Sequence, residues 1–321
     1  MKRIRMGAAF GLAGVAILAA GCDQDSNTSS DADPQWTIMK AGSAGGVLHG
    51  VVFVDANRGW VVGDSGGILN TQDGGRTWSS QASGTLNTLF GVSFSGPSSG
   101  WAVGIGGTLL ATTNGGATWS PQPSGTSQWL YAVSAIGGSA AVAVGSSGTI
   151  LKTTDGGAHW ISKVSGTNDP ITAVSFGSAL SGVAVGDNGT ILRTSDGGDT
   201  WTAAPSGTME SLNDAAMATA MEGCAVGTRG TVLTTSDGGA TWTKQASGTN
   251  ETLCGVAFDN SGKGVAVGSG GIILSTTDGG QTWTRYSSGT SVLLMRAGFS
   301  SPAVTVVVGG DSTILMGRWG S

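Results

Sequence analysis

The chain has 321 residues, of which 58 are glycine and only 11% are charged. The charged share is less than half of the roughly 25% that is usual in globular proteins, which excludes a disordered polyelectrolyte. Acidic side chains outnumber basic ones by 20 to 15, which excludes a basic nucleic-acid-binding protein. Short runs rich in Val, Thr and Trp lie between glycine-rich turns, so we expect an all-β fold.

The N-terminus has the layout of a secretory signal. Three basic side chains among the first five residues precede an apolar run of about 16 residues, which is short for a membrane span. The run closes with Leu-Ala-Ala-Gly-Cys, which resembles a bacterial lipobox and predicts that residues 1–21 are removed and Cys22 is lipidated. Ordinary signal cleavage with a free Cys22 and an uncleaved anchor are the alternatives. The lipidated form would attach the protein to a bacterial membrane.

Residues 22–34 are expected to form an acidic, flexible tether. This segment contains four aspartates and no large apolar side chain after Cys22. Asp23 directly follows Cys22 and resembles the signal that keeps lipoproteins on the inner membrane, so a location facing the periplasm is favoured over the cell surface. The folded body is predicted to span residues 35–319.

A constant spacing of 41 residues separates six tryptophans: Trp78, Trp119, Trp160, Trp201, Trp242 and Trp283. Such a period is typical of propeller blades. Each unit contains three short apolar strands, then a turn of the pattern Ser/Thr-x-Asp-x-Gly-x-x-Trp, then a fourth strand that ends in Ser-Gly-Thr. Four short strands in each unit make one blade.

The recurrent turn is the Asp-box, also called the BNR repeat. Its acidic position is filled by Asp73, Asn114, Asp155, Asp196, Asp237 and Asp278. We expect the carboxylate to accept hydrogen bonds from turn amides, the glycine to supply a positive φ, and the tryptophan to pack between the outer strands. Asn114 keeps an acceptor oxygen, which favours a structural role for this position over metal binding.

The pattern contains seven first strands but only six Asp-boxes. The seventh unit stops after a third strand near residue 317, whereas residues 35–43 resemble a fourth strand without its preceding three. If these two fragments complete one blade, an N-terminal outer strand closes the ring and removes two open edges. The sequence therefore predicts a single seven-bladed β-propeller.

The repeated GWVVG, TxDGGxTW and SGT segments resemble the photosystem II stability/assembly-factor-like family of seven-bladed Asp-box propellers, over residues 35–319. The resemblance implies a non-catalytic scaffold that docks a protein in or at the membrane. Photosynthetic members of the family resemble one another in an arginine-rich surface patch. The seven arginines of this body are spread over different blades and strands.

The loops that join fourth to first strands and second to third strands meet at one face, around the mouth of the channel and opposite the Asp-boxes. We call the equivalent positions of the seven innermost strands a column. One column holds Gly or Ala in five blades but Asp214 and Arg296 in the other two. These two side chains either line a ligand or partner pocket or form a structural ion pair. The adjacent column varies: His49, Phe90, Tyr131, Thr172, Asn213, Cys254 and Met295. Its members either shape a pocket or pack between blades.

The loops of this face add further candidates. Trp129 stands where other units have Val, Thr, Pro, Ser or Leu, and it is either an interface anchor or folded over its own blade. The turns between second and third strands contribute Asp64, Asp187, Arg229 and Asp311, which makes the face mildly acidic.

Other chemistries find less support. Asp-boxes also occur in sialidases and other glycosidases, but such enzymes need an arginine cluster or opposed carboxylates, and this chain has three Glu and two Tyr. A carbohydrate-binding or glycosidase-like surface protein remains the alternative to a scaffold. His49 and His159 stand 110 residues apart and no Cys-x-x-Cys occurs, so we expect no metal or cofactor. Cys224 and Cys254 lie on neighbouring blades, either as a disulfide or as free thiols.

Overall fold

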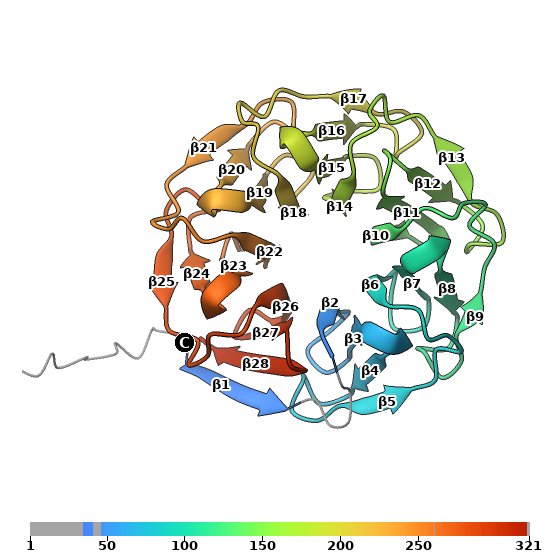
Figure 1. Cartoon of the computed structure of the whole chain (residues 1–321), viewed down its shortest axis with the longest axis horizontal. Coiled ribbons are helices and arrows are strands. Elements are labelled where there is room, and N and C mark those ends of the chain that lie inside the picture. The colour runs from blue at the N-terminus through green and yellow to red at the C-terminus, as the bar shows by residue number, and fades with distance from the viewer. Residues whose placement is uncertain (1–34, 41–45, 260, 320–321) are drawn as a thin grey trace, which may run out of the picture.

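The computed structural model describes residues 35–40, 46–259 and 261–319. These residues form seven four-stranded antiparallel sheets arranged as blades around a central channel (Figure 1). The predicted all-β, seven-bladed architecture is confirmed. The predicted signal sequence, the lipidation site Cys22 and the tether lie outside the described residues.

The strands fall into four concentric sets. The innermost strands are β2 (Leu48–Phe53), β6 (Leu89–Phe94), β10 (Leu130–Gly137), β14 (Ile171–Phe176), β18 (Leu212–Met217), β22 (Leu253–Phe258) and β26 (Leu294–Ser301). The second strands are β3 (Gly59–Gly63), β7 (Gly100–Gly104), β11 (Ala140–Gly145), β15 (Gly182–Gly186), β19 (Gly223–Gly227), β23 (Gly264–Gly268) and β27 (Val304–Gly309). The third strands are β4 (Ile68–Thr71), β8 (Leu109–Thr112), β12 (Ile150–Thr153), β16 (Ile191–Thr194), β20 (Val232–Thr235), β24 (Ile273–Thr276) and β28 (Thr313–Arg318).

The outermost strands are short and largely exposed: β5 (Ser79–Gln81), β9 (Ser120–Pro121), β13 (Ile161–Lys163), β17 (Thr202–Ala203), β21 (Thr243–Gln245), β25 (Thr284–Tyr286) and β1 (Gln35–Lys40). Single turns of 3-10 helix join the second and third strands of five blades: η1 (Asp64–Gly66), η2 (Ile105–Gly107), η3 (Asp187–Gly189), η4 (Thr228–Gly230) and η5 (Ser269–Gly271). We number the blades 1 to 7 in the order of their innermost strands.

The hydrophobic core lies between blades. Each of seven buried clusters combines side chains from two neighbouring blades. Between blades 1 and 2, Trp60 stacks on Phe94 with ring centroids 3.7 Å apart, and Trp119 meets the same Phe94 edge-on at 5.8 Å. Because the apolar surface of each blade is covered by its neighbours, the ring is the folding unit.

The Asp-box tryptophans pack against these clusters from the outer side of the ring. Trp119 of blade 2 packs into the cluster with blade 1, and its indole N–H donates to the Gln81 side chain of blade 1 at 3.3 Å. Trp160 donates in the same way to Gln122 of blade 2. Each Asp-box tryptophan thus packs into the cluster that its blade shares with the preceding blade.

The acidic residue of the Asp-box organises the turn. Asp237 accepts the amide of Thr241 at 2.9 Å and the hydroxyl of Thr241 at 2.6 Å. Asn114 accepts the amide of Thr118 in the same position and donates its own N–H to the Thr118 hydroxyl. These hydrogen bonds from Thr241 hold the pKa of Asp237 at about 2, below its usual value.

The same contacts occur in the other Asp-boxes. Asp73, Asp155, Asp196 and Asp278 each accept the amide of the residue four positions later. At Asp155 that residue is His159, whose ring nitrogen lies 2.7 Å from the carboxylate and replaces the usual threonine hydroxyl. The pKa of each of these four carboxyls is also lowered.

Blade 7 is built from both ends of the chain, as predicted. Strand β1 pairs antiparallel with β28, from Gln35 opposite Arg318 to Lys40 opposite Thr313 (Figure 1). Trp36 packs against the cluster between blades 6 and 7, over Gly317, where an added Cβ would lie 2.8 Å from the indole ring. In blade 7, Trp36 therefore takes the place of an Asp-box tryptophan.

Deleting residues 35–40 should lower the melting temperature by about 10 °C or more. The deletion removes the β1–β28 ladder and Trp36, and loss of a packed tryptophan alone costs about 3 kcal/mol, or several degrees for a domain of this size. Circular dichroism or calorimetry measures the change, and Thr37→Ala, at an exposed β1 position, is the control. A deletion variant that melts with the control would contradict closure by β1.

Replacing Asp237 with Asn should make the protein less sensitive to acid. Because the folded-state pKa of Asp237 lies below the usual 3.8, its stabilising effect is full above roughly pH 4 and is lost as the pH falls toward 2. Asparagine forms the same turn at Asn114 but does not titrate. Urea unfolding at pH 7 and below pH 4 should show a smaller acid loss for the variant, whereas Asp237→Ala should be destabilised at both. Equal acid losses in wild type and Asp237→Asn would disprove this assignment.

Candidate functional site

Each innermost strand carries a β-bulge near the channel mouth. In β2, Leu48 pairs with Gly63 and Gly50 with Val62, so His49 between them has no partner in the ladder. The same register shift occurs in all seven innermost strands. Bulges redirect side chains. The seven bulged residues are His49, Phe90, Tyr131, Thr172, Asn213, Cys254 and Met295, and all of them line one cavity of about 440 Å³.

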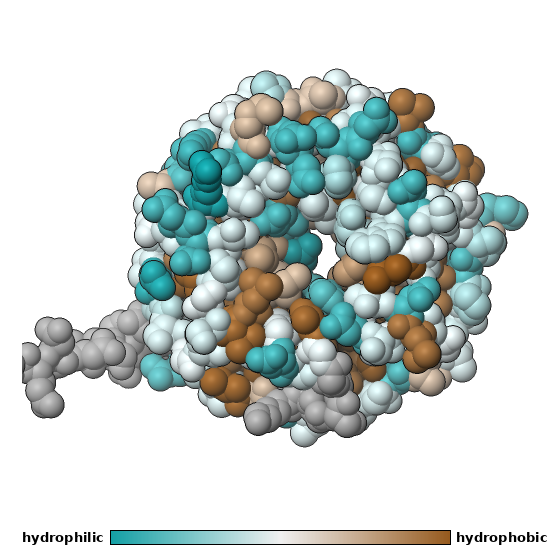
Figure 2. All heavy atoms as spheres, viewed as in Figure 1, coloured by the Kyte–Doolittle hydropathy of each residue, from teal (hydrophilic) through white to brown (hydrophobic). Residues whose placement is uncertain are grey.

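This channel-mouth cavity is the candidate site. Figure 2 shows the central opening of the ring around which it lies. Besides the bulged residues, Pro170, Thr252, Asp187 and Arg296 line it. The variable column thus lines a cavity, and Thr172 and Asn213 also donate hydrogen bonds to backbone carbonyls of the neighbouring blade.

The small residues that follow the bulges are required by close approach of the innermost strands. A Cβ added to Gly255 would lie 2.6 Å from the carbonyl oxygen of Met295, and one added to Gly91 would lie 3.0 Å from the Cα of Ala132. A side chain larger than alanine at these positions requires the neighbouring strand to shift. Asp214 and Arg296 are the two residues larger than alanine that occupy them.

Asp214 and Arg296 come together in the channel. Arg296 Nε lies 3.7 Å from Asp214 Oδ2, and the same oxygen accepts the amide of Val256 at 2.9 Å. The guanidinium also donates to the carbonyls of Cys254, Met295 and Asn213. Burial raises the pKa of Asp214, although the charge of Arg296 opposes this. The pair thus links blades 5, 6 and 7, which matches the structural ion-pair interpretation.

Aromatic rings form one side of the mouth. Phe90 lies 5.2 Å from His49, 5.7 Å from Tyr131 and 6.1 Å from Trp129, between ring centroids. The planes of these rings are inclined to one another by 35° to 75°. Trp129 is 46% exposed and contacts Phe90 of the neighbouring blade 2, so it is not folded over its own blade alone.

Asp64 and Asp187 occupy equivalent positions but have different surroundings. Asp64 accepts the amide of Val47 at 2.8 Å, lies 2.9 Å from the His49 ring and also binds the Thr88 hydroxyl. Partial burial raises the pKa of Asp64, but these hydrogen bonds outweigh it and the pKa is lowered. Among the described residues, no hydrogen bond or ion pair engages the carboxylate of Asp187.

The remaining predicted site residues lie away from the cavity. Arg229 faces Glu210 at 3.6 Å on the rim of blade 5, and its side chain is largely exposed. Asp311 is exposed in the turn between β27 and β28. The structure therefore brings together Asp214 with Arg296, and His49 with Asp64, Asp187 and the aromatic rings, but it does not add Arg229 or Asp311.

The two cysteines of the described body are free. Cys224 is fully buried between blades 5 and 6, where burial raises the pKa of its thiol well above the usual value. Cys254 lines the cavity, and burial raises the pKa of its thiol as well. Within the described ranges, no three His, Cys, Asp or Glu side chains form a metal-binding group. No helix in the described part of the chain is long and apolar enough to cross a membrane.

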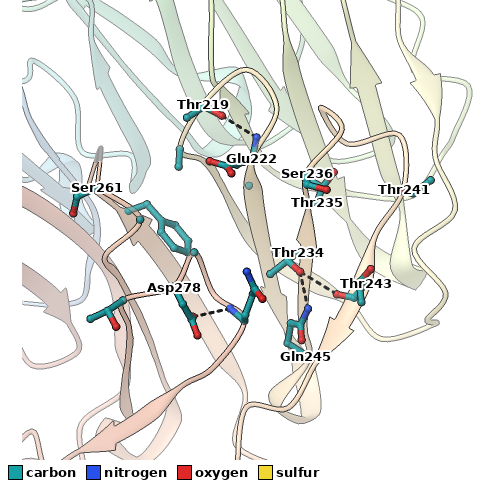
Figure 3. Close-up of a pocket in the computed structure, with 17 residues that line it drawn as sticks. Thr219, Glu222, Thr234, Thr235, Ser236, Thr241, Thr243, Gln245, Ser261 and Asp278 are labelled. Carbon is teal, nitrogen blue, oxygen red and sulfur yellow. Dashed lines mark hydrogen bonds between the residues drawn. The ribbon is translucent and has the colours of Figure 1, made fainter.

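A second cavity, of about 570 Å³, lies on the Asp-box side between blades 5 and 6 (Figure 3). Hydroxyl and carboxamide groups line it, and several bind one another: Gln245 donates to Thr234, and the Thr219 hydroxyl accepts the amide of Glu222. Sequence reasoning missed this cavity.

Gln245 lines this cavity and has a different hydrogen-bond partner from the equivalent glutamines of blades 1 and 2. Gln81 and Gln122 cross to the next blade and donate to the carbonyls of Gly115 and Gly156. Gln245 is at the equivalent position but turns to the Thr234 hydroxyl of its own blade at 2.9 Å.

The fold and the site define the class: a seven-bladed Asp-box propeller with a partly aromatic cavity at the channel mouth. A family profile described as Photosynthesis system II assembly factor YCF48 matches residues 28–172 and 206–292. This is more than half of the chain, and the chain belongs to that family.

Solved structures give the same picture. A structure of YCF48 bound to D1 peptide is 22% identical, with a TM-score of 0.74 over 89% of this chain and 97% of that chain. YCF48 from Cyanidioschyzon merolae is 25% identical, with a TM-score of 0.72 over 88% and 98%. The GH74 xyloglucanase from Xanthomonas campestris is 15% identical, with a TM-score of 0.68 over 87% of this chain and 53% of that one. None of the curated proteins matches the chain significantly.

The Asp214–Arg296 pair should behave as a coupled structural unit. Arg296→Ala leaves a buried carboxylate unpaired and should destabilise the fold by about 3 kcal/mol. The double variant Asp214→Ala, Arg296→Ala gives both blades the alanine that Ala132 and Ala173 already provide, so it should be more stable than Arg296→Ala alone. Urea unfolding measures the stabilities of the wild type, of the single variants Asp214→Ala and Arg296→Ala, and of the double variant. Simple additivity of the two single losses would contradict coupling.

Proposed function

We propose that this protein is a non-catalytic scaffold that binds a protein partner at the channel-mouth face. The observation that carries the proposal is the cluster of Trp129, Phe90 and Tyr131 around an open cavity. Exposed tryptophan and tyrosine side chains beside a pocket are the typical centre of a protein interface. Membership of the YCF48 assembly-factor family supports the same function.

The nature of the partner follows from the same comparison. YCF48 has been solved bound to D1 peptide, and we propose that this chain likewise binds a segment of another protein. Because each blade is held by two neighbours, the ring presents its loops in a fixed arrangement, and little conformational entropy is lost on binding.

We further propose that the protein is exported and lipid-anchored at Cys22, facing the periplasm. The lipobox-like sequence before Cys22 and the acidic residues 22–34 support this location. A tether of this length would keep the propeller close to the membrane and raise its effective concentration near membrane proteins.

Co-purification from membranes tests the scaffold function. The full chain, captured in mild detergent from its native membranes, should bring down a stoichiometric membrane-protein partner. The variant Phe90→Ala, Trp129→Ala should lose most of that partner, whereas Ile161→Ala, which removes an exposed apolar side chain from the outer strand β13, should retain it.

Two results would contradict the proposal. Equal recovery of the partner by the double variant and by Ile161→Ala would remove the channel-mouth face from the interface. Absence of any protein partner, together with glycan-array binding that the double variant loses, would instead support a carbohydrate-binding function for the same face.

A further inference from the structure

The channel-mouth cavity combines an aromatic side with one carboxylate that has no partner. His49, Phe90 and Tyr131 line it, and Trp129 extends the aromatic surface to the rim. The His49 and Phe90 rings meet at 75° and the Phe90 and Tyr131 rings at 51°, so neither pair is stacked in parallel. Ring faces carry negative electrostatic potential and attract cations.

Asp187 supplies the charge. It lines the same cavity, and its carboxylate has no hydrogen bond or ion pair within the described part of the chain. Burial raises the pKa of Tyr131, and the negative charge of Asp187 raises it further, so the two groups lie within electrostatic reach of each other. Asp64 shows the contrast, because its carboxylate at the equivalent position is already bound by Val47, His49 and Thr88.

The one cation in the cavity lining is not available to an anion. Arg296 is paired with Asp214 and donates to three backbone carbonyls, so its guanidinium is directed into the protein. Asp187 is thus the acidic side chain of the cavity lining, and among the described residues no hydrogen bond or ion pair engages its carboxylate.

The surrounding face has the same sign. Its described loops carry six carboxylates, at Asp64, Asp169, Asp187, Glu210, Glu251 and Asp311, against one arginine, Arg229. Arg229 itself faces Glu210. This field attracts basic segments from a distance, but it does not select a binding position.

We propose that the channel-mouth cavity binds an arginine side chain of the protein partner, stacked on the Phe90 and Tyr131 rings and paired with Asp187. The inference rests on the proposed scaffold function and specifies its partner chemistry. A guanidinium is flat, stacks on aromatic faces and forms two parallel hydrogen bonds to a carboxylate, whereas an ammonium is a compact, strongly hydrated charge.

A probe peptide tests this directly. Acetyl-Gly-Gly-Arg-Gly-Gly-amide, labelled with ¹³C at the guanidinium carbon, is titrated with the full chain in mild detergent, and the shift and broadening of that resonance are followed. Binding should weaken about tenfold or more when citrulline, which is neutral but of similar shape, replaces arginine. A lysine peptide should bind more weakly than the arginine peptide.

Matched variants locate the site. Asp187→Asn should weaken arginine binding about tenfold, and Phe90→Leu, which keeps apolar volume but removes the ring, should weaken it severalfold. Asp311→Asn removes the same charge from the same face outside the cavity and should have little effect. Unchanged melting temperatures confirm that the variants are folded.

Several results would overturn the inference: equal binding of the citrulline peptide, equal binding of the lysine peptide, or an equal loss in Asp187→Asn and Asp311→Asn. Failure here is separable from failure of the scaffold function. If the membrane partner is still lost in Phe90→Ala, Trp129→Ala but is retained by Asp187→Asn, the face is an interface and the arginine assignment alone is wrong.

Discussion

The packing of each blade against its two neighbours is the constraint on which the structure depends. Every core cluster takes side chains from two blades, so a blade alone would expose both of its apolar faces. The innermost strands approach so closely that Gly91 and Gly255 leave no room for a Cβ without movement of the next strand. Farther out, Trp119 and Trp160 hydrogen-bond to the preceding blade. Contacts near the channel and contacts near the outer edge of the ring thus both fix the spacing and orientation of the blades.

This fixed frame leaves the bulged residues free to vary. A bulged residue is unpaired in the ladder and lines the cavity at the channel mouth, and none of the seven belongs to a buried cluster between blades. The bulged residues of blades 1 to 3 are His49, Phe90 and Tyr131, and those of blades 5 to 7 are Asn213, Cys254 and Met295. A ring of nearly identical units thereby acquires an asymmetric cavity, in which one side is aromatic and the other contains the buried Asp214–Arg296 pair.

The sequence predicts the fold well because the same pattern of strands and Asp-box turn occurs in six successive units. The period of 41 residues, the Asp-box turns and the incomplete seventh unit are enough to predict the blade number and the closure by β1. The hydrogen-bond partner of an individual side chain is harder to predict from the sequence, because it depends on which residues lie next to that side chain in the folded structure. Gln81, Gln122 and Gln245 are the same residue at the same position, yet the hydroxyl of Thr234 redirects only the third. Asp64 and Asp187 differ in the same way, since only Asp64 has a histidine beside it.

Pairing of β1 with β28 has a consequence for how the chain is made. Gln35 lies in the first described strand and its partner Arg318 in the last, so β1 has no place in a sheet until β28 has been synthesised. Contacts between such distant segments form late in folding. A chain interrupted anywhere before β28 keeps one sector of the ring open, with apolar faces exposed to chaperones and proteases. Only a chain that includes β28 can therefore close the ring and cover the apolar faces of all seven blades.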